Sequence, residues 1–108
     1  DHAPKYVFRI CHGRPSAPTV PGRYQIQTKM PMAYGSQWDL DMPYWLGIYY
    51  AGGSENGFHA LPILSNGQIL WSGALGTRCS FGCIVLDTED AKTLYDWAEL
   101  GTVVIVTQ

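Results

Sequence analysis

Residues 23–30 have the sequence RYQIQTKM, in which polar and apolar side chains alternate with a period of two. This alternation is typical of a β-strand with one buried face, because successive side chains of a strand point to opposite faces. Tyr24, Ile26 and Thr28 would share the buried face. The stretch therefore predicts a half-buried strand and favours a β-rich fold.

Further short strands are predicted on both sides of this stretch, at residues 6–11, 44–50, 58–63, 69–71 and 102–106. The last of them, TVVIV, is apolar enough to predict a buried strand. Gly and Pro punctuate the chain, and Asn66-Gly67 is a strong hairpin signal. We interpret residues 12–22, 31–43 and 73–83 as loops and residues 52–57 as a turn.

One helix is predicted after residue 87. Its apolar face would consist of residues at i, i+3, i+4 and i+7 spacing, namely Ala91, Leu94, Tyr95 and Ala98. Asp87 or Thr88 can cap its start, and Gly101 is expected to end it in the left-handed conformation. The predicted fold class is mainly β, a small curved sheet or β-sandwich with one helix in the C-terminal half.

Length and composition exclude several classes of protein. A chain of 108 residues suits one domain, which we expect to span residues 1–108. With 46% apolar and 15% charged residues, the chain is too apolar to be disordered. A net charge of −2 leaves no broad basic surface for nucleic acid. No apolar run approaches the roughly twenty residues of a transmembrane segment.

The segment Ser80-Phe81-Gly82-Cys83 carries the strongest chemical signal, just before the apolar run 84–86. Acyl transfer needs a thiolate nucleophile, a base that generates it, and backbone donors for the oxyanion. Cys83 can supply the nucleophile, and the N–H groups of Gly82 and Cys83 can supply the donors. His59 is the best candidate base because it lies at a predicted strand edge, whereas His2 and His12 are weaker candidates.

The cysteines leave other interpretations open. Three cysteines are too few for a disulfide scaffold, so Cys11 is expected in the core and Cys79 as a plain thiol. A Cys79–Cys83 bridge would silence the nucleophile. A zinc site built from Cys79, Cys83 and a histidine is the metal alternative. Taken alone, Cys83 would be a buried small hydrophobe and His59 a hydrogen-bonded strand histidine.

Four segments, taken in order, resemble the catalytic domain of the L,D-transpeptidases, bacterial enzymes that cross-link peptidoglycan through a cysteine. They are residues 18–26 (PTVPGRYQI), 42–45 (MPYW), 58–60 (FHA) and 80–84 (SFGCI). The resemblance extends from about residue 16 to residue 106, and the first family strands are expected to be missing before Tyr6. It implies a function outside the cytoplasm, in the periplasm or cell wall.

The resemblance also implies roles for individual residues. The Ala60 carbonyl would orient His59, and Cys83 would form a thioester with a stem tetrapeptide, with Gly82 beside the oxyanion. The implied substrate-binding residues are Ser80, Phe81, Trp38, Tyr44 and Trp45. Nothing in the resemblance demands a metal or an organic cofactor. Carbapenem-type compounds are the implied covalent inhibitors.

Two departures from the family pattern keep other functions open. Phe81 stands where the family usually has His, and Val85 stands where it commonly has Arg or Asn. Neither change removes the nucleophile or the base. An L,D-carboxypeptidase or amidase-like hydrolase, with water as acceptor, is one alternative, and a degenerate peptidoglycan-binding module is another. A low pKa of the Cys83 thiol would argue against the binding module.

Overall fold

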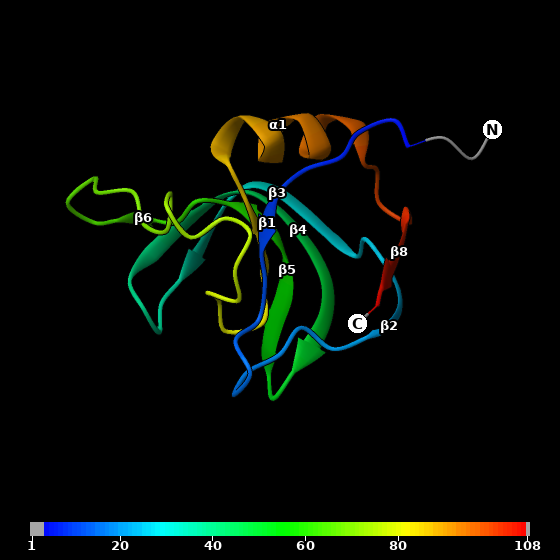
Figure 1. Ribbon diagram of the computed structural model, residues 1–108, viewed down its shortest axis with the longest axis horizontal. Helices are drawn as coiled ribbons and strands as arrows, with labels where there is room; N and C mark the ends of the chain where they lie inside the picture. Colours follow the sequence, from blue (N-terminus) through cyan, green and yellow to red (C-terminus); the bar gives the residue numbers. More distant parts are fainter. Residues whose placement is uncertain (1–3, 108) are drawn as a thin grey trace.

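The computed structural model describes residues 4–107 and shows a curved sheet with one helix packed against one face (Figure 1). The elements are β1 (Ile10–Cys11), β2 (Gly22–Gln25), β3 (Thr28–Gly35), β4 (Leu40–Ala51), β5 (Ser54–Ala60), β6 (Ile63–Leu64), β7 (Ile84–Leu86), α1 (Thr88–Trp97) and β8 (Val103–Val106). The predicted fold class, mainly β with one helix in the C-terminal half, is confirmed.

The main sheet has the strand order β1-β7-β5-β4-β3, and β6 pairs with part of β4. All of these pairs are antiparallel except β5 with β7, which is parallel and places His59 opposite Val85. A parallel pair needs a crossover connection. Residues 61–83 form that connection, so they return the chain to a position beside β5 just before Ile84.

The sheet separates two groups of buried side chains. On the face toward α1, the buried residues are Leu46, Ile48 and Leu86. They pack with Ala91 of the helix and with Ala98, its C-terminal cap. On the other face, a smaller cluster contains Cys11, Leu61 and Val85, with Trp71, Leu75 and Cys79 packed against it. The crossover connection therefore covers the face of the sheet that the helix leaves open.

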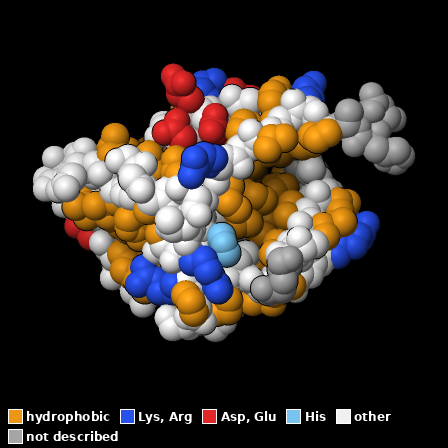
Figure 2. Space-filling model, viewed as in Figure 1, with side chains coloured by type: hydrophobic (Ala, Val, Ile, Leu, Met, Phe, Trp, Pro, Cys, Tyr) orange, Lys and Arg blue, Asp and Glu red, His pale blue; other side chains and the backbone are white. Residues whose placement is uncertain are grey.

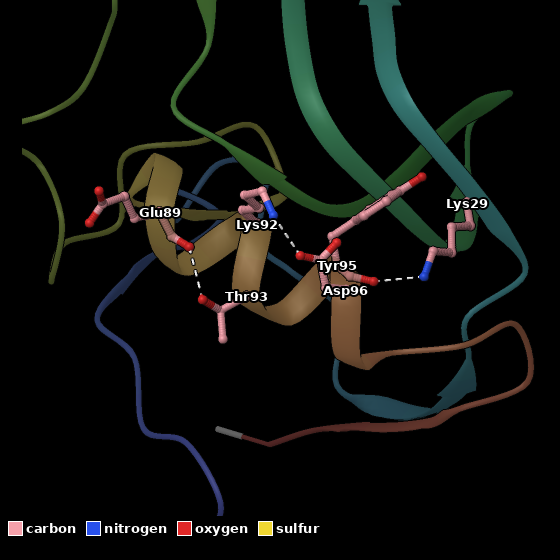
Figure 3. A network of polar contacts seen from close by, with 6 residues as sticks. All are labelled: Lys29, Glu89, Lys92, Thr93, Tyr95 and Asp96. Atoms are coloured by element: carbon pink, nitrogen blue, oxygen red, sulfur yellow. Dashed lines mark hydrogen bonds and ion pairs between the residues drawn. The ribbon is translucent and has the colours of Figure 1, made fainter.

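A lysine from β3 stabilises the C-terminal end of α1, which has no basic residue in its own last turn. Lys29 Nζ donates a hydrogen bond to the carbonyl oxygen of Tyr95 at 2.6 Å (Figure 3). It donates a second hydrogen bond to the carbonyl oxygen of Ala98 at 2.7 Å. It also lies 4.4 Å from the centroid of the Tyr95 ring. A cation at this end of a helix satisfies free carbonyls and interacts favourably with the helix dipole.

The predicted strand at 23–30 is divided between two sheets. Ile26 N–H donates to Thr102 O, and Ile26 O accepts from Gly101 N–H, so Ile26 remains with the β2–β8 ribbon. The next residue, Gln27, donates instead to Gly47 O of β4. The predicted alternation is nevertheless confirmed, because Ile26 is buried and its neighbours on both sides are exposed.

The prediction of a loop at 31–43 is wrong, because β3 continues to Gly35 and β4 begins at Leu40. The segment is part of a long β-hairpin, but its two prolines favoured the prediction of a loop. Pro31 lies on the edge strand of the sheet, and Pro43 precedes the β4–β5 ladder, which begins at Leu46. Proline is tolerated at such positions because one side of the strand lacks a hydrogen-bonded partner there.

Other boundaries also differ from prediction. The turn predicted at 52–57 is shorter, since β5 already begins at Ser54. The strand predicted at 6–11 is reduced to β1, and the one at 69–71 to a single Ile63–Ile69 bridge. The helix ends at Trp97 with Ala98 as its cap, so Gly101, at φ +90°, turns the following connection instead.

The last strand, β8, is less buried than its sequence predicts. Within the described residues it pairs only with β2, in a two-stranded ribbon, and Ile105 is 68% exposed. Figure 2 shows apolar side chains gathered in a hollow of the surface beneath α1, on the face that also displays this ribbon in Figure 1.

Within residues 4–107, no helix is long and apolar enough to cross a membrane.

Candidate active site

Most of the predicted site residues line one cavity of about 260 Å³ on the face of the sheet opposite α1. Its walls come from the β3–β4 hairpin, β5 and the crossover connection. The lining residues are Trp38, Leu40, Met42, Trp45, Ala51, Ser54, Glu55, Asn56, His59, Pro62, Trp71, Ser80, Phe81 and Cys83. The cavity thus brings together His59 and Cys83, which are 24 positions apart in the sequence.

His59 is held in one tautomer by its neighbour on β5. Its Nδ1 lies 2.6 Å from the Ala60 carbonyl oxygen, which can only accept a hydrogen bond. We therefore assign the proton to Nδ1, which leaves the Nε2 lone pair free. Burial lowers the pKa of His59 to about 4, with the Ala60 hydrogen bond opposing this in part. The ring is thus neutral near pH 7, as a general base must be.

Cys83 is the free cysteine of the described chain and ends the loop of residues 79–83, which we call the nucleophile loop after the role predicted for Cys83. Its thiol lies 3.5 Å from Asn56 Oδ1, to which it donates a weak hydrogen bond. Burial raises the pKa of Cys83 to about 11, and the negative charge of Glu55 adds to this. The low thiol pKa that would have argued against a binding module is therefore absent in this resting state.

The nucleophile loop is held by its own polar groups and by residues of the N-terminal segment. Ser80 Oγ donates to Cys83 O at 2.6 Å and accepts from Gly82 N–H at 3.2 Å. Thr19 Oγ1 donates to Gly82 O at 2.7 Å. Gly82 has φ +129°, which a residue with a side chain rarely adopts. Because Gly82 N–H is already bonded to Ser80, its role as an oxyanion donor stays a prediction.

Arg14 supplies a cation to this loop, a contact that sequence reasoning missed. Its guanidinium donates to the carbonyl oxygens of Ser80 (3.1 Å, from Nε) and Cys79 (2.5 Å, from Nη2). It also lies 3.9 Å from the centroid of the Phe81 ring, and that ring stacks on Trp38. The Pro- and Gly-rich sequence around Arg14 gives no local signal for a contact with residues 65 and 66 positions away.

Glu55 and Asn56 were also missed, because the sequence predicts a turn at residues 52–57. Both lie on β5 and line the cavity. The indole of Trp45 links Glu55 to His59, since Trp45 Nε1 donates to Glu55 Oε1 at 3.1 Å and the ring stacks on His59. The spacing of four between Glu55 and His59 could have indicated one strand face, had β5 been extended back to residue 54.

Tyr44 is the predicted substrate-binding residue that the structure places elsewhere. Its ring packs against Tyr95 of α1, on the other face of the sheet. The cause is local. Tyr44 has φ +59°, which interrupts the alternation of side chains between the two faces of β4. As a result, Met42 and Trp45 both line the cavity. Trp38, Trp45, Ser80 and Phe81 do line it, and their roles toward a substrate stay predictions.

Cys11 lies in the core, as predicted, but the prediction of a plain thiol at Cys79 is wrong. The two residues form a disulfide with a Cα–Cα distance of 5.6 Å. The bridge joins β1 to the start of the nucleophile loop. It also removes the proposed Cys79–Cys83 bridge and the zinc site, both of which need a free Cys79. Within residues 4–107, no group of three or more His, Cys, Asp or Glu side chains could hold a metal ion.

Two other predicted features lie apart from the cavity. His12 lines a separate hollow with Ile10 and Arg78, and His2 lies outside the described residues. Val85, at the position where the family commonly has Arg or Asn, is fully buried against Cys11 and Leu61. A cation at residue 85 would therefore be enclosed by apolar groups rather than presented to a ligand.

Comparisons with known proteins agree with this fold. The family model described as YkuD, L,D-transpeptidase catalytic domain, matches residues 1–106. A search of curated protein sequences gives no significant match. Among solved structures, an L,D-transpeptidase from Mycobacterium smegmatis is similar with a TM-score of 0.76 at 22% identity, over 94% of this chain and 48% of that one.

Two similar structures come from Mycobacterium tuberculosis. An L,D-transpeptidase from strain H37Rv has a TM-score of 0.72 at 28% identity, over 94% of this chain and 42% of that one. L,D-transpeptidase 3, in complex with a faropenem-derived adduct, has a TM-score of 0.73 at 27% identity, over 100% of this chain and 49% of that one. This chain thus spans less than half the length of these structures. It belongs to the family of L,D-transpeptidase catalytic domains.

Proposed function

We propose that this domain is a cysteine L,D-transpeptidase that cross-links peptidoglycan stem peptides through a thioester on Cys83, with His59 as the base. The observation that carries this proposal is the shared cavity of the two side chains, in which His59 Nδ1 is bonded to the Ala60 carbonyl. That bond directs the basic Nε2 away from the strand backbone. The cavity is also the size of a small peptide segment, at about 260 Å³.

The resting pair consists of a neutral thiol and a neutral imidazole, because the pKa of Cys83 is raised and that of His59 lowered. The proton must therefore leave Cys83 for His59 Nε2 as the sulfur attacks the carbonyl between the third and fourth stem residues. The C–N bond then breaks, and His59 returns the proton to the amine of the departing D-alanine. Each backbone donor to the oxyanion contributes about 3–4 kcal/mol in other enzymes.

The second half of the reaction releases Cys83. An amine on another stem attacks the thioester carbonyl, the new C–N bond forms, and the C–S bond breaks. The amine loses a proton and the sulfur regains one, with His59 as the carrier. Water in place of the amine would give an L,D-carboxypeptidase, which is the alternative outcome of the same acyl-enzyme. The acceptor thus decides between the two activities.

A location outside the cytoplasm is part of the proposal. Disulfides persist in oxidising compartments and are rare in the cytosol. The Cys11–Cys79 disulfide supports this location, because its Cα–Cα distance of 5.6 Å lies within the usual range for bridged cysteines. Peptidoglycan is assembled in such a compartment, so the location and the proposed substrate agree.

The test is incubation with a disaccharide-tetrapeptide followed by intact-mass analysis of protein and products. Wild-type protein is compared with Cys83→Ala, which keeps the disulfide and the fold. A cross-linked dimer with released D-alanine, absent from the variant, is the expected result. Trimmed tripeptide without dimer would favour the carboxypeptidase. No adduct and no product from folded protein would leave a peptidoglycan-binding module as the function.

A further inference from the structure

Glu55 lies where the active-site cavity adjoins a second cavity of about 430 Å³ along the β3–β4 hairpin. The walls of both cavities contain Trp38, Met42, Trp45, Ser54 and Glu55. The nucleophile Cys83 lines only the first cavity. A reaction that joins two substrates at Cys83 needs two such approaches, one for the acyl group and one for the acceptor.

Neutral donors hold the Glu55 carboxylate in place. Oε2 accepts hydrogen bonds from Thr28 Oγ1 at 2.6 Å and Gln27 Nε2 at 2.9 Å, while Oε1 accepts from Trp45 Nε1 at 3.1 Å. A carboxylate has about four lone-pair sites, so one remains for a ligand. Because these partners come from β3, β4 and the residue before β3, the carboxylate is fixed before any ligand arrives.

Glu55 is also the one formal charge in the walls of the two cavities. Every other lining residue is apolar or neutral, including His59, whose pKa is lowered to about 4. No cation balances the charge, since the ion pair found within residues 4–107 is Lys92–Asp96 on α1. A half-buried carboxylate without a counter-ion favours a cationic ligand, because a charge-assisted hydrogen bond is stronger than a neutral one.

We propose that the Glu55 carboxylate binds the primary ammonium group of the acceptor stem, which lies in the second cavity while the acyl group occupies the first. The proposal therefore requires that the acceptor is a side chain that ends in an unhindered alkylammonium group. Bound beside the thioester, the ammonium releases one proton to water, and the free amine attacks the thioester carbonyl. The C–S bond breaks and the second proton passes to Cys83.

This inference rests on the proposed function, so the test separates the two. The acyl-enzyme is formed first with a tetrapeptide donor, and the partition of the thioester between amine and water is then measured. Glu55→Gln removes the charge while keeping the shape and one acceptor oxygen. Asp39→Asn is the matched control, because Asp39 also carries a charge on the β3–β4 hairpin but lines neither cavity. Asn also tolerates the positive φ of that position, +53°.

The two nucleophiles to compare are an alkylammonium acceptor and hydroxylamine, which is uncharged at neutral pH. In Glu55→Gln, transfer to the alkylammonium acceptor should fall roughly ten- to hundredfold, the equivalent of one charge-assisted hydrogen bond. Transfer to hydroxylamine and hydrolysis, both measured from the acyl-enzyme already formed, should remain near the wild-type values. An equal loss with both nucleophiles, or no loss with either, would overturn the proposal and leave Glu55 a structural residue.

If the Glu55→Gln variant fails to fold, a measurement on the wild-type protein tests the same proposal. An alkylammonium acceptor should saturate at about a tenfold lower concentration than an alkoxyamine of equal length, and added salt should reduce this advantage. Equal saturation of the two would overturn the role of Glu55 while leaving the thioester chemistry intact. Absence of any acyl-enzyme in the wild type would instead overturn the proposed function.

Discussion

The guanidinium of Arg14 lies 3.9 Å from the centroid of the Phe81 ring and donates to the two carbonyls that precede that ring in the chain. Trp38, at the end of the β3–β4 hairpin, stacks on the same ring at 5.6 Å. The nucleophile loop is therefore held between the N-terminal segment and a hairpin from the main sheet. In this chain the Phe81 ring packs against both Arg14 and Trp38.

Replacement of Arg14 by Lys should loosen the nucleophile loop while keeping the charge. Lysine has no planar fork, so it cannot stack on Phe81 and donate to both carbonyls in the same geometry. We expect acylation of Cys83 to slow about tenfold and the free energy of unfolding to fall by about 1 kcal/mol. Single-turnover mass spectrometry and urea unfolding measure these effects. Arg23→Lys, at an exposed position on β2, is the control, and an equal effect there would contradict the assignment.

Lys29→Met should destabilise the fold far more than Lys92→Met. Lys29 makes two hydrogen bonds to carbonyls at the end of α1, whereas Lys92 forms an exposed ion pair with Asp96. We expect a loss of about 2–3 kcal/mol for the first variant and little or no loss for the second, whose ion pair is screened by solvent. Urea unfolding at pH 7 measures both. Similar losses in the two variants would show that Lys29 does not stabilise the helix end.

Burial of neutral His59 should make the protein less stable in mild acid. In the unfolded chain the imidazole takes up a proton near pH 6.5, but in the folded protein it does so only near pH 4. The unfolded state therefore binds more protons between these values, and stability falls as the pH is lowered through this window. The loss amounts to roughly 3 kcal/mol. His59→Gln should lack this part of the pH dependence of unfolding, and an unchanged dependence would contradict the burial effect.

The raised pKa of Cys83 predicts slow alkylation at neutral pH. A pKa of about 11 in place of 9.0 reduces the thiolate fraction about a hundredfold at pH 7. The rate with iodoacetamide should therefore keep rising from pH 7 to pH 10 without a plateau. Acylation by the peptide substrate should not follow this profile, because in the proposed mechanism His59 removes the proton during attack. Fast alkylation at pH 7 with a plateau would instead indicate a preformed thiolate.

Reduction of the Cys11–Cys79 disulfide should destabilise the domain substantially. The bridge closes a loop of 68 residues in the unfolded chain, for which the loop-entropy relation gives about 4 kcal/mol. The measurement is urea unfolding of Cys83→Ala with and without reductant, because this background has no free thiol that could exchange. Wild-type protein unfolded without reductant should react with one equivalent of a thiol reagent, at Cys83. Three reactive thiols would show that the disulfide is absent.

Features that depend on neighbouring residues could be predicted from the sequence alone. The helix at 88–97, the Asn66-Gly67 turn and the burial of Ile26 all follow from patterns over a few positions. The resemblance in segments 18–26, 42–45, 58–60 and 80–84 pointed to the family that the comparisons show. Local periodicity and short motifs carry this information because side-chain direction repeats every two or 3.6 residues.

Other features required the tertiary structure, because they join residues that no local pattern relates. Arg14 meets Cys79 across 65 positions, Lys29 meets Tyr95 across 66, and Cys11 meets Cys79 across 68. The sequence at 23–30 alternates as one strand, yet its backbone changes hydrogen-bond partners after Ile26 because two different sheets lie beside it. The chain thus determined its helix and its strand faces from nearby residues. Packing alone placed Glu55 between two cavities, since its position depends on donors from three separate segments.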